Sequence, residues 1–547
     1  MQTPRDISLL ELEDIDNKWN NIDNFYSRYT VNPYFILKRN GNQNNEDRFF
    51  GSLNLEYHFT SYLNLNLRMG GDVSNENLEE WREIIKPGGN NEFAAISEPG
   101  MRGKSSRRRL ELNADLILNY QKQFGDYSLG ALVGYNMNAR EFTSLSTQVN
   151  GLVIEGFPQL SNSSEKPSSG EYFQQRRLAG VYSSLDAGYK SILFLTLTAR
   201  NDWSSTLPVK NNSFFYPGVN LGFIFTELVP SIQSVLPYGK LRFGWAQVGN
   251  DAPPYSINNS FVSGFHSDGF GFFSYPLVNG VNSYEVGNLI GNQELRPEMS
   301  TEFEVGADVR FFNNRVGIDF TYYDRTVNDL IWAAPLARSS GYSSQLINLG
   351  EITNNGVELL VKLTPVERNS FVWDISVNYT KNNNMLVRLN DDLERIVFNS
   401  LVVEGGQQIH YVGKPGNPIG IFEGRTPMMD EQGRMVVDNT GLPKAAEDLK
   451  EYGNSQYDFT AGVSNSFSYK NVSLGATIDI RQGGLMYSRT KDISVWAGTV
   501  PATLYNLREP FIIPNAVYEV EQDENEEPVY AENTIPLDAV HIVDYWG

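Results

Sequence analysis

The chain has 547 residues with 44 basic and 65 acidic side chains, which gives a formal net charge of −21 at pH 7. This balance argues against a nucleic-acid-binding protein, because such a surface needs clustered Lys and Arg. The chain contains no cysteine, so disulfide bonds and thiolate metal sites are excluded. No run of about 18 apolar residues occurs, and the sequence therefore predicts no transmembrane helix.

Apolar and polar residues alternate along most of the chain, and a period of two indicates β-strands. The first hairpin alternates Leu53, Leu55 and Tyr57 with polar residues and turns at Thr60 and Ser61. Further arms with this pattern lie at 110–118, 129–137, 181–189, 193–203, 215–225, 241–245, 303–311, 316–323, 357–363, 371–379, 457–469 and 472–480. We count about fourteen strands, joined as antiparallel hairpins.

The hairpin from 302 to 323 shows the alternation most clearly. Its apolar positions include Phe303, Val305 and Val309, and its polar positions include Glu304, Asp308, Arg310 and Asp319. Each arm has roughly 10 to 13 residues, which exceeds the usual strand of about 5 to 6 and matches the ~9 to 11 residues that cross a bilayer. We therefore expect the apolar set to face lipid and the polar set to line an aqueous lumen.

The connections fall into two classes. Short turns alternate with long segments at about 74–107, 140–176, 250–298, 327–354, 384–456 and 485–547. Transmembrane β-barrels have this organisation, with short turns on one side and long loops on the outer side. A set of soluble β-sandwiches is the alternative, but sandwich strands are shorter and their loops do not divide so cleanly. The sequence predicts an all-β fold, an antiparallel transmembrane β-barrel.

The two ends of the chain lack this pattern. The first residues contain no basic segment followed by an apolar one, so no signal peptide is recognisable. The last residues contain no amphipathic strand that would close a barrel. We expect residues 1–45 to be a loop or lead-in segment, 46–485 to form the barrel hairpins with long outer loops, and 486–547 to be a loop. On this basis the chain is predicted to be an internal portion of a longer protein.

Several longer runs resemble one family closely. They are ARNDWSSTLP (199–208), SFFYPGVNLGFIFTE (213–227), YGKLRFGWAQVGNDAPPY (238–255), NQELRPEMSTEFEVGADVRFFNNRVGIDFTYYDRT (292–326), SSGYSSQLINLGEITNNGVEL (339–359) and YDFTAGVSNSFSYKNVSLGATIDIRQGG (457–484). Over about residues 45 to 500 the chain resembles the SusC/RagA family, the TonB-linked outer-membrane transporters of Bacteroidetes.

The resemblance implies a barrel of 22 strands, filled by an N-terminal plug and capped by a SusD-like lipoprotein. About 14 of those strands are recognisable here, whereas a plug domain and a TonB-contacting segment are not. The implied function is TonB-dependent uptake of oligosaccharides or peptides across the outer membrane, with the TonB complex and the lipoprotein as partners. Two alternatives stay open, namely a surface binding or adhesion barrel without transport and an inert fragment.

The sequence offers no catalytic site. The four histidines, His58, His266, His410 and His541, lie far apart and none belongs to a metal-binding or hydrolase motif. Two acidic turns lack the full spacing of a calcium loop. We therefore predict that the chain is not an enzyme and binds no cofactor or metal.

Candidate substrate-binding residues are aromatic side chains near Asp or Asn in the predicted outer segments. They are Asn201, Asp202 and Trp203, then Asp251 and Tyr255, and finally Trp81, Trp332 and Tyr342. One alternative is that NDWSSTLP and GNDAPPY are loop-folding motifs whose aspartates accept backbone hydrogen bonds. In a third interpretation, these segments form the docking surface for the lipoprotein.

Overall fold

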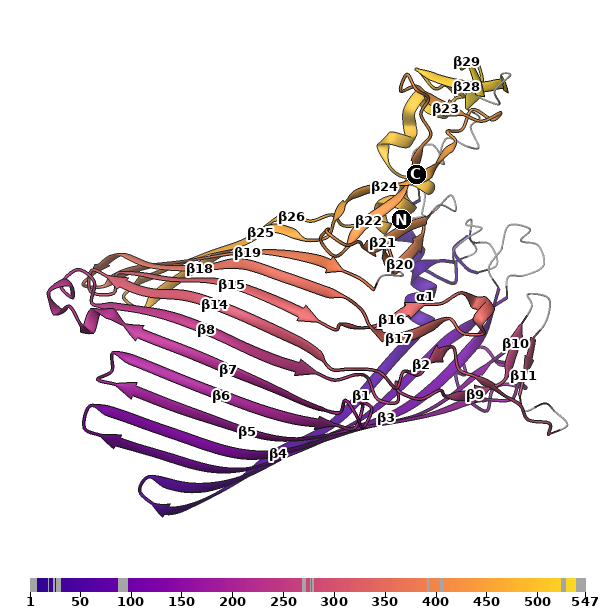
Figure 1. The fold of residues 1–547 in the computed structure, drawn as a ribbon. Coiled ribbons are helices and arrows are strands. Elements are labelled where there is room, and N and C mark those ends of the chain that lie inside the picture. The colour runs from indigo at the N-terminus through magenta and orange to yellow at the C-terminus, as the bar shows by residue number, and fades with distance from the viewer. Residues whose placement is uncertain are drawn as a thin grey trace.

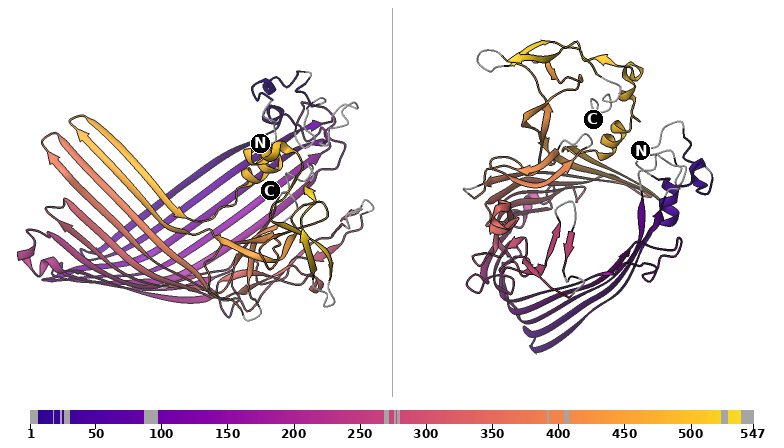
Figure 2. Two further views of the ribbon diagram at one scale, coloured as in Figure 1. Left: turned by 90° about the horizontal axis from the view of Figure 1, so that it is seen from above. Right: turned by 90° about the vertical axis from the view of Figure 1, so that its right-hand side faces the viewer.

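A single large antiparallel sheet dominates the computed structural model, which describes residues 7–17, 19–22, 25, 31–86, 97–267, 272–275, 277, 280–390, 393–403, 408–522 and 528–537. Its fourteen strands follow one another in chain order. They are β1 (Gly41–Thr60), β2 (Leu63–Ile85), β3 (Glu98–Phe124), β4 (Tyr127–Asn150), β5 (Ser168–Tyr189), β6 (Leu193–Ser204), β7 (Ser213–Ile224), β8 (Tyr238–Asn250), β14 (Glu298–Phe311), β15 (Val316–Asn328), β18 (Glu351–Arg368), β19 (Phe371–Arg388), β25 (Tyr457–Tyr469) and β26 (Val472–Gly483). The sheet curves into an open barrel wall with β1 and β26 at its edges (Figures 1 and 2). The predicted antiparallel fold with about fourteen strands is confirmed.

The register divides the side chains of the sheet between two faces. Val305 lies opposite Phe243 on β8 and Tyr322 on β15, and the same face continues through pairs such as Leu67 with Leu116, Leu185 with Leu197, Phe320 with Leu359 and Val463 with Ile478. The other face is polar, with pairs such as Asp72 with Glu111, Glu111 with Arg140 and Asp308 with Asp319. Glu304, Asp308, Arg310 and Asp319 all lie on this polar face.

The polar face is the concave one. Tyr182 on β5 donates a hydrogen bond to Asp115 on β3 at 3.1 Å, and Tyr323 on β15 donates one to Asn382 on β19 at 3.0 Å. Each bond passes over an intervening strand, which requires the sheet to curve towards these side chains. The lumen-facing role of the four polar residues of β14 and β15 stays a prediction, and their position on the concave face supports it.

The strands nearest the N-terminus are much longer than a bilayer requires. They have 20, 23, 27, 24 and 22 residues in β1 to β5, against the ~9 to 11 that span lipid. The prediction of long loops at 74–107 and 140–176 was therefore wrong over most of both segments, because β2 runs to Ile85 and β4 to Asn150. Beyond the membrane both faces meet water, so the apolar alternation ends although the hydrogen-bonded ladder continues.

The long connections carry smaller sheets at the end of the wall opposite the short turns (Figure 1). These strands are β9 (Phe261–Ser263) with β12 (Tyr284–Val286), β10 (Phe265–Ser267) with β11 (Phe272–Ser274), β13 (Leu289–Ile290) with β17 (Ser344–Asn348) and β16 (Ile331–Pro335), and β20 (Ile396–Val402), β21 (Gln408–Gly413), β22 (Ile421–Pro427) and β24 (Ala445–Asn454). The short helices are η1 (Glu11–Glu13), α1 (Pro33–Arg39), η2 (Phe225–Glu227), η3 (Pro230–Ile232), η4 (Arg338–Ser340), α2 (Arg489–Trp496) and η5 (Pro501–Arg508). None of the helices in the described parts of the chain is both long enough and apolar enough to span a bilayer.

The prediction that 486–547 is a loop was wrong for its described part, which folds against an earlier connection. β28 (Ala516–Gln522) pairs in parallel with β23 (Met435–Val437) and also pairs with β29 (Pro528–Glu532). Next to them β27 (Phe511–Ile512) pairs with β30 (Pro536–Leu537). Val437, Ile513, Ala516 and Leu537 form the core of this unit, which projects from the wall in Figure 1. Its strands are short and come from distant segments, so no long alternation marks them in the sequence.

The facing of β14 gives a first prediction. Val305→Arg should destabilise the protein in a bilayer by roughly 2 to 4 kcal/mol if the residue meets the lipid near its midplane. Asp308→Asn, on the opposite face and three positions along, should have little effect. Urea titration of both variants in lipid vesicles measures the difference, and equal destabilisation would contradict the assignment of the two faces.

Candidate functional site

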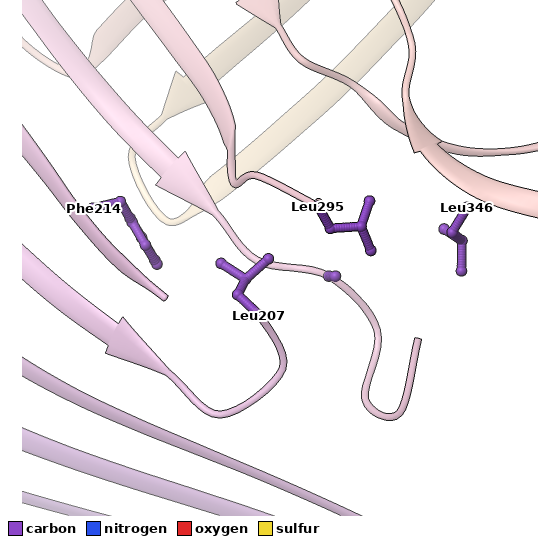
Figure 3. Packing of buried hydrophobic residues seen from close by; sticks show 5 residues of the cluster. Leu207, Phe214, Leu295 and Leu346 are labelled. Atoms are coloured by element: carbon purple, nitrogen blue, oxygen red, sulfur yellow. The ribbon is translucent and has the colours of Figure 1, made fainter. Parts of the chain in front are cut away.

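A small apolar core ties the outer ends of the strands together. Leu207, Phe214, Ala252, Leu295 and Leu346 form it, and all are at most 8% exposed. Figure 3 shows Leu207, Phe214, Leu295 and Leu346 reaching this cluster from separate segments of the chain. Each comes from a different one of the sequence runs quoted for the family resemblance. We call this cluster the rim core, and it shows that these runs fold the loops at the strand ends.

The three neighbours at the end of β6 do not form one site. Asp202 is only 3% exposed on the polar face, where Arg200 donates to it at 2.9 Å and the Tyr216 hydroxyl also donates. Asn201 and Trp203 lie on the opposite face, since their strand partners are Val181 and Ala179 of the apolar side. Asp202 is therefore held by β6 and β7, and the exposed ring of Trp203 points away from it.

Asp251 lies just beyond the end of β8 and fixes the following loop to β5 and β6. Arg176 donates two hydrogen bonds to its carboxylate, at 2.8 and 2.9 Å, and Ser204 and Thr206 donate as well. Burial alone would raise the pKa of Asp251, but these hydrogen bonds and the charge of Arg176 outweigh it and hold the pKa below its usual value. The loop is thus anchored by an ionised, nearly buried carboxylate.

Tyr255 follows in the same loop. Its hydroxyl accepts a hydrogen bond from the backbone N–H of Gln175 at 3.0 Å, and its φ of 64° turns the chain sharply there. Its ring is 54% exposed. Among the predicted binding residues, Tyr255 therefore combines a fixed position with a ring surface that a ligand can reach.

The remaining aromatic candidates lie elsewhere, and two of them are occupied in packing. Trp81 lies on β2 rather than in a loop, with the Arg102 guanidinium 5.6 Å from its ring centre. Trp332 packs edge to face on Phe398, with ring centres 5.1 Å apart, against a second core that contains Leu349 and Leu386. Tyr342 lies between η4 and β17. No hydrogen bond or ring contact described in the structure brings these three side chains to Tyr255.

Sequence reasoning missed a charged cavity of about 720 Å³ on the concave face of β1 to β5. It is lined by Glu46, Arg48, Asp72, Arg109, Glu111, Arg140, Phe142 and Arg176, and by Pro254 from the loop after β8. We call it the arginine cavity. Part of the signal was present in the sequence, because charged residues alternate at Glu46 and Arg48 and again at Arg107, Arg109 and Glu111. Their alignment, however, depends on a register that only the structure supplies.

Pairs of opposite charge line this cavity. Arg48 donates to Asp72 at 2.9 Å, and Arg140 lies 3.0 Å from Glu111. Arg109 lies 3.3 Å from Glu76 and 5.6 Å from the Phe142 ring centre. The Arg48, Arg109 and Arg140 side chains are more than half exposed, so water screens these pairs and each contributes little to stability. They can exchange their partners for the polar groups of a ligand.

The cavity contains hydrogen-bonding and ionic groups but no arrangement typical of catalysis. In the described ranges, no group of three or more acidic or histidine side chains could hold a metal ion. Of the histidines, His58 lies 3.5 Å from Glu56 and His410 lies 2.7 Å from the Ser400 hydroxyl. The His541 position lies outside the described residues.

Comparison with known proteins identifies the family. Residues 5–418 match the family model described as TonB dependent receptor-like, beta-barrel. The chain belongs to this family. TonB-dependent receptor P3 of Formosa agariphila is 24% identical over 84% of this chain and 47% of its own length. TonB-dependent receptor SusC of Bacteroides thetaiotaomicron is 24% identical over 83% of this chain and 45% of its own length.

Solved structures show the same fold. A structure of the RagAB peptide transporter superposes with a TM-score of 0.66 at 18% identity, over 82% of this chain and 49% of the other. The chain spans about half the length of the curated relatives it matches. It is a TonB-dependent receptor of the SusC/RagA type, and these receptors are outer-membrane proteins of Bacteroidetes.

The anchored loop of the receptor gives a second prediction. Because the folded-state pKa of Asp251 lies below its unfolded value of about 4, the ionised carboxylate stabilises the docked loop above that pH. This contribution is lost as the pH falls through the lower folded-state pKa. Asp251→Asn should abolish the pH dependence and weaken docking by roughly 1 to 3 kcal/mol. Amide hydrogen exchange of residues 251–257 at several pH values measures it.

A carboxylate of the same rim serves as the control. Glu294 is exposed and pairs only with Lys210 in the described structure, so Glu294→Gln should leave the exchange of the 251–257 amides unchanged. An Asp251→Asn variant that keeps the wild-type pH dependence would show that another group anchors the loop.

Proposed function

We propose that this receptor imports oligosaccharides or peptides across the outer membrane and that its concave face is part of the import path. The observation that carries the proposal is the arginine cavity, which lies on the same face as the polar pairs further along the wall. A SusD-like lipoprotein at the long-loop end and energy from TonB complete the proposed system. The description of RagAB as a peptide transporter supports transport as the general activity.

The cavity is suited to be the first contact for a ligand. It lies towards the long-loop end, where Pro254 contributes to its lining and Arg176 holds Asp251 in place. Oligosaccharides and peptides both carry many hydrogen-bonding groups, and charge-assisted hydrogen bonds are the stronger ones. A ligand held at the exposed pairs would therefore gain directional contacts without a deep apolar pocket.

The polar lining continues well beyond the cavity. Towards the short turns, Arg242 on β8 donates to Asp319 on β15 at 2.5 Å across β14. A receptor that only holds its ligand at the surface requires no polar lining along the whole wall. This continuity favours import over a surface binding or adhesion barrel without transport.

Substitution of one arginine that lines the cavity tests the proposal. Arg140→Gln removes a cation that is 58% exposed in the cavity, and it should weaken ligand binding by roughly 1.5 to 3 kcal/mol, the range for a hydrogen bond to a charged group. Calorimetry against panels of short peptides and of oligosaccharides measures the affinity. Uptake of the labelled ligand by cells, compared with its surface retention, distinguishes import from binding alone.

Arg177→Gln is the matched control. Arg177 is opposite Ala139, on the face away from the cavity, whereas its neighbour Arg176 is opposite Arg140. This variant has the same change of charge and should bind ligand as the wild type does. Equal losses in both variants would indicate a general electrostatic effect and remove the cavity from the proposed path.

Two aromatic variants test the loop after β8. Tyr255→Ala should weaken ligand binding by about 1 to 3 kcal/mol, as loss of an aromatic interface side chain does, because its ring is exposed near Pro254 of the cavity. Trp203→Ala should leave binding unchanged, because that ring lies on the apolar face. The same calorimetric assay measures both variants. A larger loss for Trp203→Ala would favour the original hypothesis that Trp203 contacts the substrate.

A further inference from the structure

The short-turn end of the apolar face carries exposed aromatic rings with lysines against them. Lys122 lies 4.6 Å from the Tyr62 ring centre and 5.2 Å from that of Phe124. Lys190 lies 5.3 Å from the ring of Tyr189, and Lys470 lies 5.4 Å from that of Tyr469. We call the three lysines and these four rings the lysine–aromatic belt. The arrangement recurs in three separate hairpins of a chain whose net charge is −21.

The register places the rings of Phe124, Tyr189 and Tyr469 on the apolar face, and Tyr62 lies in the turn between β1 and β2. Phe124 is opposite Tyr127, which is opposite Tyr189, and Tyr469 is opposite Phe371 and Val472. Lys122 is opposite Leu129 on the same face, two positions from Phe124. The belt thus lies where the apolar face ends and the turns begin, which is the level of lipid headgroups if this face meets lipid.

Two of the three lysines have no acidic partner among the residues that the structure describes. In the described part of the chain Lys190 pairs with Asp126 at 3.2 Å, whereas neither Lys122 nor Lys470 forms an ion pair with a carboxylate. Tyr62, Phe124 and Tyr469 are 38%, 47% and 55% exposed, so the rings beside these two cations are open to a ligand from the membrane side. The belt thus combines unpaired positive charge with apolar surface at one level of the wall, next to the short turns.

We propose that the lysine–aromatic belt binds the headgroups of anionic phospholipids, with Lys122 and Lys470 contacting the phosphate and the rings contacting the first segments of the acyl chains. The inference rests on the membrane orientation of the proposed function but not on ligand import. Charge complementarity supports it, because an ammonium near an anionic lipid surface contributes about 1 kcal/mol. The ring contact also restrains the flexible lysine stem, so the cation is held at the interface.

The experiment uses the receptor with its barrel closed, reconstituted into phosphatidylcholine bilayers with a trace of spin-labelled lipid. The measured quantity is the association constant of labelled phosphatidylglycerol relative to labelled phosphatidylcholine. Lys122→Gln and Lys470→Gln should each lower this ratio about five-fold, which corresponds to about 1 kcal/mol. The double variant should lose most of the preference for the anionic lipid.

A double variant with the same change of charge is the control. Lys362 is at the same end of the wall but on the concave face, opposite Gly317, and Lys381 is opposite Val357 on the apolar face, well above the belt. Lys362→Gln with Lys381→Gln should keep the wild-type preference. An equal loss in the two double variants would overturn the proposal, since net charge alone would then explain the preference.

Two further measurements distinguish a lipid headgroup from a soluble phosphate and test the contribution of the aromatic ring. An excess of inorganic phosphate at constant ionic strength should leave the preference intact, and full competition would show that a soluble anion rather than a headgroup occupies the belt. Tyr469→Leu, which keeps the charge and removes the ring beside Lys470, should also lower the ratio. Ligand affinity is measured separately on the same samples, so failure of the import proposal and failure of the lipid proposal give different results.

Discussion

Backbone hydrogen bonding is the constraint on which the rest of this structure depends. A strand in lipid must satisfy its N–H and C=O groups through its neighbours, because no water is present to replace them. The consecutive pairing from β1 to β26 gives every inner strand of this sheet a hydrogen-bonded neighbour on both sides. The outer edges of β1 and β26 have no such pairing within the described sheet, and unpaired edges are not tolerated in a bilayer.

The same hydrogen-bonded pairing of strands also separates the side chains that face lipid from the side chains that form ion pairs. Because side chains alternate, one backbone places Val305 on the apolar face and Asp308 on the polar face, and the curvature brings the polar side chains together. Contacts such as Arg242 with Asp319 then connect strands that are not neighbours. The concave face is consequently braced by polar contacts across the strands, while the convex face contributes the largely apolar surface that the bilayer requires. The alternation of side chains thus accounts both for the polar contacts across the strands and for the polar lining of the concave face.

The features that could be predicted from the sequence are those that depend on a pattern within one strand. Alternation within one arm needs only neighbouring residues, so the strands, their pairing order and the two faces were all predictable. The family resemblance was also readable, but its residues proved to fold the outer loops, since Leu207, Ala252 and Leu295 meet in the rim core. These runs therefore identify the family and the fold, and among their residues Pro254 and Tyr255, at the end of one run, lie at the proposed ligand site. Strand length was underestimated because β2 and β4 continue beyond the region where lipid imposes alternation.

The candidate site was less predictable because it depends on contacts between distant segments. Arg176 meets Asp251 over 75 positions of sequence, and Arg140 faces Arg176 only through the pairing of β4 with β5. Nothing in the residues near any one of these arginines reveals that they share a cavity. The grouping of Asp202 with Trp203 in one site was wrong for a different reason, because adjacent residues of a strand point to opposite faces. Strict use of that alternation separates the two residues from sequence alone, and proximity in the chain was the wrong guide to proximity at the site.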